Sequence, residues 1–256
     1  RHVRVMREAF AGLDTVLAYA MKANSNQAIL KLIASEGGGA DVVSLGELER
    51  ALRAGIAPER IVFSGVAKTR AEMVRGLEAG ILCFNIESEP ELERLDKVAG
   101  EMGMVAPVSV RINPDVDART HAKISTGKSE NKFGIPYQRA GEVYARIAQS
   151  ANLKAVGVDM HIGSQITELE PFDNAFALLA ELVGQLRAAG HGIEHVDVGG
   201  GLGIPYQQDN APPPDPVEYA KLVRRHIDPL GVKLVLEPGR LIAGNAGIMV
   251  TRVEYV

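Results

Sequence analysis

Short apolar segments alternate with amphipathic segments along the whole chain. The apolar segments predict eight strands, at residues 16–21, 40–43, 61–64, 82–85, 108–112, 156–161, 195–198 and 233–237. Between them, apolar residues recur at the 3.6-residue spacing of a helix, as in the segment 171–189. Strands that take turns with helices are typical of a parallel sheet covered by helices. Eight such repeats predict an α/β fold of the (β/α)8 barrel type, also called a TIM barrel.

Several of the predicted helices have recognisable ends. Ser44, Thr69 and Ser88 each stand three residues before a glutamate, which is the spacing of a capping box. Gly80 follows the third predicted helix at the position where a glycine often ends one. These signals divide the chain into the same units as the apolar pattern.

Composition limits the partners that we expect. The 256 residues are enough for one large barrel, and 46% of them are hydrophobic. A net charge of −4 gives no reason to expect nucleic acid as a partner, and no apolar stretch approaches the roughly 20 residues of a membrane span. The single cysteine, Cys83, excludes an internal disulfide framework and suits a reducing compartment. We therefore expect a cytoplasmic protein with a small-molecule substrate.

Both ends of the chain interrupt a pattern. The chain begins at Arg1 within a helical pattern and lacks an initial Met, and residues 248–256 alternate like a strand beyond the eighth barrel strand. We expect a barrel at residues 1–245, followed at residues 246–256 by the first strand of a truncated, β-rich C-terminal domain. The chain is thus predicted to be part of a longer protein.

Two connections exceed the usual length of about 2–6 residues between strands and helices. One runs from 113 to 136 and the other from 199 to 216. Both follow a strand, so they would lie on the face of a barrel that carries active sites. They would cover a substrate or meet a partner subunit, and the alternative is a tolerated surface insertion.

Residues with candidate chemistry stand at the C-terminal ends of these strands. Lys22 ends the first strand, where burial would lower its pKa and make it a nucleophilic amine; the alternative is a solvated surface lysine. His161 ends the sixth strand as a general base, a metal ligand or a flat ring for stacking, and no second His or Cys stands at metal-ligand spacing. Ser164 offers a hydroxyl to a phosphate or to a turn.

Glycines follow the seventh and eighth strands, where barrels usually bind phosphate. Gly199, Gly200 and Gly201 could direct backbone N–H groups at an anion, although a tight turn has the same sequence. Gly239 and Arg240 add a glycine and a guanidinium to this corner. We therefore predict a phosphate site.

A carboxylate completes the predicted site. Glu237 ends the eighth strand, and a carboxylate opposite a pyridine nitrogen favours the protonated ring, which is a strong electron sink. Asp41 could steady Lys22, and Arg111 could reach a phenolic oxygen of the cofactor. An amine, a flat ring, a glycine loop and a carboxylate at one end of a barrel together predict a pyridoxal 5'-phosphate site without metal.

Four motifs in this order carry a resemblance to a known family. They are Tyr-Ala-Met-Lys-Ala-Asn at 19–24, His-Ile-Gly-Ser-Gln at 161–165, Gly-Gly-Gly-Leu-Gly at 199–203 and Glu-Pro-Gly-Arg at 237–240. The chain resembles the pyridoxal-phosphate-dependent decarboxylases with an alanine-racemase-type barrel. Within them it is most similar to the diaminopimelate decarboxylase family, with Glu-Asn-Lys-Phe-Gly at 130–134 as a further match.

The resemblance implies a role for each matching residue. Lys22 would bond to the cofactor aldehyde, His161 would stack on its ring, and Glu237 would bind its pyridine nitrogen. The phosphate would be held by Ser164, Gly199, Gly200, Gly201 and Gly239, while Arg240 would help to place a substrate carboxylate. The implied reaction is loss of CO2 from the D-centre of meso-diaminopimelate to give L-lysine.

The family also takes a cysteine, a glutamate and a tyrosine from its C-terminal domain, partly across a homodimer interface. Here Cys83 lies within a barrel strand and suits packing, so residues 1–256 alone are expected to be poorly active.

Other activities remain open at this stage. Ornithine- or arginine-type decarboxylases would share the barrel, but the loop after strand five and the His-Ile-Gly-Ser-Gln motif favour the diaminopimelate type. An alanine racemase would be expected to place an arginine at the pyridine nitrogen. A non-catalytic barrel for vitamin B6 handling would need no second domain. A cofactor-free, lysine-dependent aldolase would give Glu237 and His161 no shared purpose.

Overall fold

Eight parallel strands close into a barrel in the computed structural model, which describes residues 1–114, 133–206 and 213–256. The strands are β1 (Thr15–Ala20), β2 (Gly39–Val42), β3 (Ile61–Phe63), β4 (Cys83–Ile86), β5 (Ala106–Asn113), β7 (Leu153–Asp159), β8 (His195–Asp197) and β9 (Lys233–Leu236). Each pairs with the next in this order, and β9 pairs with β1 to close the ring. The predicted (β/α)8 barrel is confirmed. The largest difference in bounds is at β7, which begins three residues before the predicted strand.

One further strand was not predicted. The two-residue β6 (Ile135–Pro136) pairs in parallel with the end of β5, where Ile112 lies opposite Ile135. Two residues are too few to produce an alternating pattern in the sequence, so this strand could not be recognised there.

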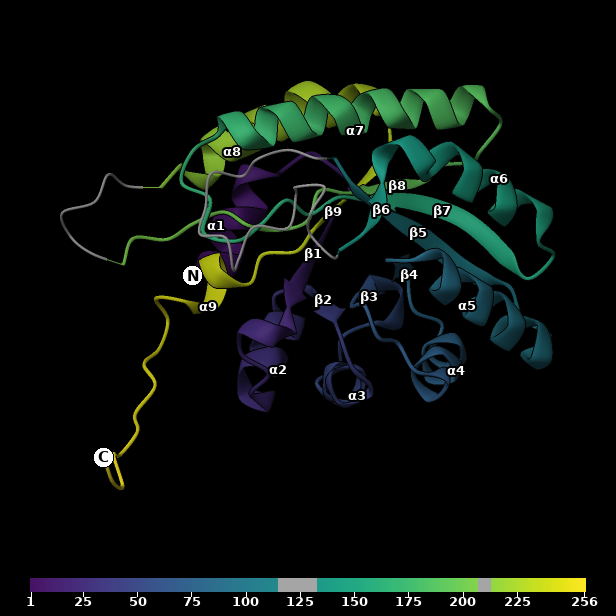
Figure 1. Ribbon diagram of the computed structural model, residues 1–256. Coiled ribbons are helices and arrows are strands. Elements are labelled where there is room, and N and C mark those ends of the chain that lie inside the picture. Colours follow the sequence, from purple (N-terminus) through teal and green to yellow (C-terminus); the bar gives the residue numbers. More distant parts are fainter. Residues whose placement is uncertain (115–132, 207–212) are drawn as a thin grey trace.

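Helices surround the barrel (Figure 1). They are α1 (His2–Ala9), α2 (Gln27–Ser35), α3 (Leu45–Arg53), α4 (Arg70–Ala79), α5 (Glu89–Met102), α6 (Ala140–Gln149), α7 (Glu170–Ala188), α8 (Pro216–Ile227) and the short α9 (Arg240–Ala243). In Figure 1, α2, α3, α4 and α5 lie on one side of the strands, and α6, α7 and α8 lie on the other.

The predicted helix starts are partly confirmed. At α4, Thr69 and Glu72 form a complete capping box. Ser44 and Ser88 each accept the expected backbone N–H bond, but the glutamate three residues later binds the N–H of the residue before the cap. Gly80 caps the C-terminus of α4 with φ +67°, a conformation that favours glycine.

Two sets of buried apolar side chains follow from the alternation along the strands. One set packs between the strands and the surrounding helices, and it includes Tyr19, Phe63 and Phe84. The other is a smaller, separate cluster of residues from five strands around the ring: Val16, Ala18, Val62, Cys83, Val156 and Val235. Since successive side chains of a strand point to opposite faces, this second cluster fills the interior of the barrel.

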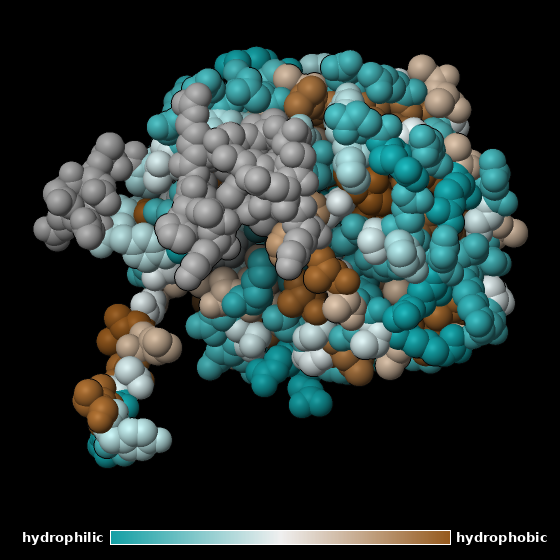
Figure 2. Space-filling view, viewed as in Figure 1, coloured by the Kyte–Doolittle hydropathy of each residue, from teal (hydrophilic) through white to brown (hydrophobic). Residues whose placement is uncertain are grey.

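The C-terminal segment leaves the barrel (Figure 1). Residues 247–256 form neither helix nor strand, and their apolar side chains are exposed, as at Ile248 and Tyr255, each 91% exposed. Figure 2 shows these hydrophobic side chains along the projecting segment. The strand predicted for 248–256 is therefore not formed within this chain, and its pairing with a second domain stays a prediction.

Most of the first long connection and a third of the second lie outside the described residues. Residues 115–132 and 207–212 belong to them, including Glu130, Asn131 and Lys132 of the fifth matching motif. Their predicted roles stay predictions. No helix in the described part of the chain is both long and apolar enough to cross a membrane.

Candidate active site

The interior of the barrel changes from apolar to polar toward the C-terminal ends of the strands. Polar residues of seven strands, within the strands or just after them, stand here: Asp41, Ser64, Asn85, Glu87, Ser109, Arg111, Asp159, Asp197 and Glu237. Ser64, Asn85 and Glu237 stand two residues beyond Val62, Cys83 and Val235 of the apolar cluster, so the period of two places their side chains on the interior face as well. The strands converge on one end of the barrel, which therefore collects these polar groups in one place.

Lys22 and Asp41 form an ion pair at this end. Lys22 lies in a single 3-10 turn directly after β1, and β1 pairs with β2 so that Ala20 lies opposite Asp41. The Nζ atom of Lys22 is 3.0 Å from Oδ2 of Asp41, whose side chain is fully buried, while that of Lys22 is 55% exposed. The carboxylate of Asp41 raises the pKa of Lys22, with a smaller contribution from Glu237, and outweighs the effect of burial.

The predicted role of Asp41 as the partner of Lys22 is thus confirmed. The prediction that burial lowers the pKa of Lys22 is wrong in this structure, because the neighbouring carboxylate has the larger effect. The amine is held here as a charged group.

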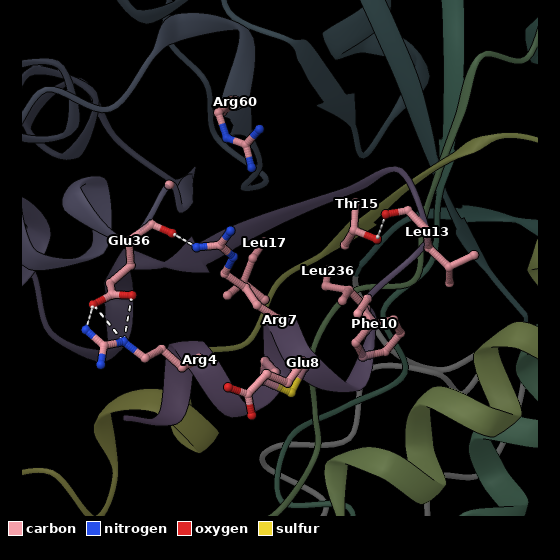
Figure 3. A pocket seen from close by; sticks show the side chains of 13 residues that line it. Arg4, Arg7, Glu8, Phe10, Leu13, Thr15, Leu17, Glu36, Arg60 and Leu236 are labelled. Atoms are coloured by element: carbon pink, nitrogen blue, oxygen red, sulfur yellow. Dashed lines mark hydrogen bonds and ion pairs between the residues drawn. The ribbon is translucent and has the colours of Figure 1, made fainter.

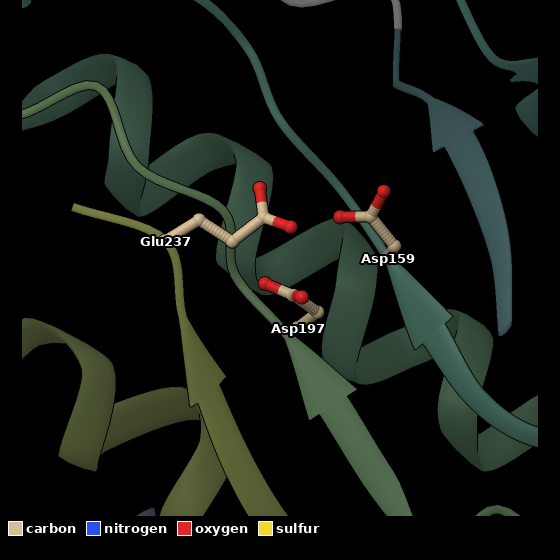
Figure 4. Close-up of side chains that lie close together, drawn as sticks. All are labelled: Asp159, Asp197 and Glu237. Atoms are coloured by element: carbon tan, nitrogen blue, oxygen red, sulfur yellow. The ribbon is translucent and has the colours of Figure 1, made fainter. Parts of the chain in front are cut away.

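The carboxyl groups of Asp159, Asp197 and Glu237 lie close together (Figure 4). One carboxylate oxygen each from Asp159, Asp197 and Glu237 lies within 4.8 Å of the others, and all three residues are buried. Burial raises the pKa of Asp197 to about 7 and that of Glu237 well above its ordinary value, and the neighbouring acids raise the pKa of Glu237 further. Like charges this close cannot all ionise without large cost, so the cluster holds protons near neutral pH.

Glu237 also receives hydrogen bonds from the opposite side of the barrel. The side-chain amide of Asn85 and the hydroxyl of Ser64 each donate to its Oε1 at 3.4 Å, and Asn85 donates to Ser64 at 3.1 Å. Asn85 lies on β4, four strands from β9 around the ring. These bonds fix the orientation of Glu237.

A buried chain of ionic contacts holds Arg111. Its Nη1 donates to Oε1 of Glu87 at 2.9 Å, and the N–H of Gly65 donates to the same oxygen. The N–H of Glu87 in turn donates to Glu91, which pairs with buried Lys68 at 2.6 Å. Burial opposes the charge of Arg111, but Glu87 and the other nearby acids keep its pKa above the ordinary value. Arg111 is therefore a fixed cation in the barrel end.

Neighbouring segments lie so close to the glycines of the site that a side chain at these positions would collide with them. A Cβ atom would lie 2.8 Å from a backbone oxygen at Gly199, 2.3 Å from one at Gly200 and 2.5 Å from one at Gly201. At Gly239 it would lie 3.1 Å from Ala20, at the end of β1. The glycine loops therefore pack directly on the neighbouring strand ends.

His161 lies against the glycine run, since the N–H of Gly200 is 3.2 Å from its Nδ1. Burial, followed by the charges of Arg111 and Lys22, lowers the pKa of His161 well below its ordinary value, so its ring is neutral. The guanidinium of Arg240 donates to the hydroxyl of Ser164 at 3.1 Å.

One observation shows that these residues fit pyridoxal phosphate. Buried oxygens of Asp41, Glu87, Asp159 and Asp197 have no hydrogen-bond partner among the described residues, so this interior suits a group that brings a positive charge, as a protonated pyridine ring does. The glycine run lies beside it, but neighbouring backbone fills the space at these glycines, and the N–H groups of Gly199 and Gly200 bind Asp197 and His161. The roles predicted toward the cofactor stay predictions for every site residue: Lys22, Asp41, Arg111, His161, Ser164, Gly199, Gly200, Gly201, Glu237, Gly239 and Arg240.

Several residues of the site were missed in the sequence. Asp159 precedes His161 by two positions, and Asp197 precedes Gly199 by two, so each faces the same interior as its predicted neighbour. A charged residue inside an apolar strand was the available signal. Lys68 gave no comparable signal, because it lies in a loop and pairs with a helix residue distant in sequence.

A cavity of about 560 Å³ lies elsewhere, beside α1 (Figure 3). Its lining includes Glu36, whose carboxylate accepts from Arg4 and whose backbone oxygen accepts from Arg7. Arg60, just before β3, and Thr15, at the start of β1, also line it. None of the predicted site residues lines it, so size alone does not identify the active site here.

Comparisons with known proteins show which proteins this chain is similar to. The chain is 52% identical to the diaminopimelate decarboxylase of Pseudomonas aeruginosa over 253 residues, which is 99% of this chain and 60% of that protein. It is also 52% identical to the diaminopimelate decarboxylase of Vibrio cholerae, of which it covers 61%. The chain thus spans about 60% of the length of these relatives.

Solved structures show the same fold. Diaminopimelate decarboxylase from Helicobacter pylori, in complex with L-lysine, matches with a TM-score of 0.91 and 43% identity over 94% of this chain and 61% of that one. The lysine/ornithine decarboxylase of Vibrio vulnificus, at 20% identity and a TM-score of 0.78, shares the fold.

The family described as "Pyridoxal-dependent decarboxylase, pyridoxal binding domain" matches residues 1–244. The chain therefore belongs to the pyridoxal-dependent decarboxylases, of which it represents the pyridoxal-binding domain.

Proposed function

We propose that this chain is the cofactor-binding barrel of a pyridoxal-phosphate-dependent decarboxylase that converts meso-diaminopimelate to L-lysine and CO2. The observation that carries the proposal is the meeting of Lys22, Glu237 and the glycine run at one end of the barrel. The substrate is supported by the 52% identity to proteins named diaminopimelate decarboxylase and by the L-lysine bound in a similar structure.

Lys22 supplies the amine for the cofactor aldehyde. When bound, pyridoxal phosphate supplies the electron sink that stabilises the carbanion left by loss of CO2. Asp41 lies 3.0 Å from the Lys22 amine and favours its charged form. Asp41 therefore keeps a proton on the Lys22 nitrogen, and Lys22 must lose this proton before it can act as a nucleophile.

Glu237 controls a proton at the ring nitrogen. Burial and the neighbouring acids raise the pKa of Glu237 well above its ordinary value, which favours the protonated carboxyl, so Glu237 would be able to supply a proton to the pyridine nitrogen of the cofactor. Asn85 and Ser64 keep its Oε1 in place. The neutral ring of His161 suits stacking on a flat group, because no charge has to be desolvated.

The substrate side of the site extends beyond this barrel. Arg240 carries a charge at the barrel end and is proposed to help place a substrate carboxylate, as Arg111 is for the phenolic oxygen of the cofactor. We further propose a homodimer and a cytoplasmic setting, which the single buried Cys83 suits.

The test uses the full-length protein. Borohydride reduction of the cofactor-loaded protein, followed by peptide mapping, should label Lys22. CO2 release should be substantially faster from meso-diaminopimelate than from L-ornithine or L-arginine. Labelling elsewhere would contradict the assignment of Lys22, and a preference for ornithine or arginine would contradict the substrate.

Two further outcomes separate the alternatives. Cofactor retention without CO2 release from any of these amino acids would favour a non-catalytic vitamin B6-binding barrel. Residues 1–256 alone should retain cofactor but produce little lysine, and substantial lysine production would show that the barrel needs no further residues.

A further inference from the structure

Two loops at the phosphate end of the barrel are joined by one side chain. The first loop follows β7 and contains His161 and Ser164, while the second follows β8 and contains the glycine run 199–201. Between them stands Gln165. Its Nε2 donates to the backbone oxygen of Ile204 at 2.7 Å, and its Oε1 accepts from the N–H of Ile204 at 3.2 Å.

The backbones of the same loops are also in contact. The N–H of Ile166 donates to the oxygen of Gly201, and the N–H of Gly203 donates to the oxygen of Ile166, both at 2.9 Å. Ile166 and Leu202 form an isolated parallel bridge. The amide of Gln165 extends this short ladder by one more pair of bonds, so that the loop with Ser164 and the loop with the glycines form one unit.

The backbone of Gln165 has an unfavourable conformation. Its φ of +59° lies in the left-handed region, and it is the one non-glycine residue with positive φ in the described part of the chain. For an ordinary residue this conformation is uncommon and costs free energy, so it persists where surrounding contacts require it. The two bonds to Ile204 are such contacts.

We propose that Gln165 is a positioning residue for the phosphate group of the cofactor. It touches neither the predicted amine nor the predicted ring partner. It fixes the distance between the hydroxyl of Ser164 on one loop and the backbone of Gly199, Gly200 and Gly201 on the other. This inference rests on the proposed function only through the cofactor, and it makes no use of the substrate.

The test compares two ligands on the full-length, cofactor-free protein. Pyridoxal phosphate and pyridoxal both carry the aldehyde that bonds to Lys22, but only the first carries a phosphate. In Gln165→Ala, the dissociation constant of pyridoxal phosphate should rise about tenfold, the effect of losing roughly one to two neutral hydrogen bonds. The dissociation constant of pyridoxal should change by less than about twofold, because the ring and amine contacts are intact.

Further variants separate the amide from the backbone conformation. Gln165→Gly removes the cost of positive φ and the amide together, so it should bind pyridoxal phosphate as weakly as the alanine variant does. Gln165→Glu keeps one acceptor for the N–H of Ile204 and should lie between them, and it also serves if the alanine variant does not fold. Gln185→Ala is the matched control, because that exposed amide binds only Glu181 on its own helix.

The outcomes each decide the matter. Wild-type affinity in Gln165→Ala or Gln165→Gly would overturn the proposal, as would equal losses for pyridoxal phosphate and pyridoxal, which indicate a general structural role. A wild-type protein that binds pyridoxal phosphate but does not decarboxylate diaminopimelate would contradict the proposed substrate and leave this inference standing.

Discussion

The two halves of the barrel interior are built from the same strands but by opposite means. Toward the N-terminal ends, Val62, Cys83 and Val235 pack together in an apolar cluster. Asn85 stands two residues after Cys83, and Glu237 stands two residues after Val235. Asn85 donates a hydrogen bond to Glu237 across the barrel. Residues only two positions apart on one strand thus belong either to an apolar core that stabilises the fold or to a site of buried polar and ionisable groups.

The difference is energetic as well as chemical. The apolar half gains free energy from burial, and any one of its side chains can be shortened at a moderate cost. In the polar half each buried charge depends on a particular partner, and loss of one partner leaves the other unpaired in the interior. Sensitivity to substitution should therefore be concentrated in a few pairs of the polar half.

The largest expected effect is that of Lys22→Ala on activity. Loss of the amine should lower kcat/KM of the full-length protein by at least about 10⁴-fold, because Lys68, another lysine near this end, is buried and bound to Gly65, Asn85 and Glu91. Lys22→Arg retains the charge beside Asp41 but cannot replace the amine, so it should be equally inactive. Activity within tenfold of wild type in either variant would remove Lys22 from the chemistry.

The next largest effect concerns the free energy of unfolding. Lys68→Met leaves Glu91 buried without its partner and should destabilise the protein by about 3–5 kcal/mol in urea denaturation. The double variant Lys68→Met/Glu91→Leu removes both charges and should recover most of that loss. Lys154→Met breaks an exposed ion pair and should cost less than about 1 kcal/mol.

The double variant is the decisive one for the comparison. If it remains as unstable as Lys68→Met, the pair contributes more than mutual neutralisation. Lys68 also binds the backbone oxygens of Gly65 and Asn85, and Glu91 accepts the N–H of Glu87, so these bonds would then stabilise the segments next to the polar half.

The barrel could be predicted from the sequence, and so could the placement of Lys22, Glu237 and the glycine run at one end of it, because both depend on local order. Strand and helix periodicity gave the eight strands, and Lys22, Glu237 and the glycine run stand at strand ends, where a barrel collects its site. Asp41 could be assigned to Lys22 because neighbouring strand ends pair in register.

What could not be predicted depends on contacts between distant segments. The pKa of Lys22 follows from a buried carboxylate at 3.0 Å and not from the burial of the lysine itself. Lys68 and Gln165 lie in loops, where no periodicity indicates which backbone groups they bind. Residues 248–256 have the alternation of a strand, but a strand needs a partner as well as a pattern.

A smaller effect is expected from pH. The folded-state pKa of Asp197, about 7, lies above the ordinary value of 3.8, so this group stabilises the fold fully below that ordinary value and loses the contribution as pH rises through about 7. Asp197→Asn keeps the acceptor for the N–H of Gly199 and removes the titration. Its unfolding free energy relative to wild type should increase by roughly 2 kcal/mol between pH 4.5 and 6.5 in the cofactor-free protein. Parallel curves for the two proteins would show that Asp197 is ionised throughout this range.

The smallest expected effect is at the boundary between the halves. Cys83 belongs to the apolar cluster, yet its Sγ lies 3.5 Å from Asn85 and 3.6 Å from His195. Burial raises the pKa of this thiol, so it stays uncharged and unreactive. Cys83→Ala should cost about 1 kcal/mol of unfolding free energy and change the dissociation constant of pyridoxal phosphate by less than about twofold. A larger loss of cofactor affinity would mean that Cys83 supports Asn85 and, through it, Glu237. Cys83 would then belong to the site as well as to the apolar cluster.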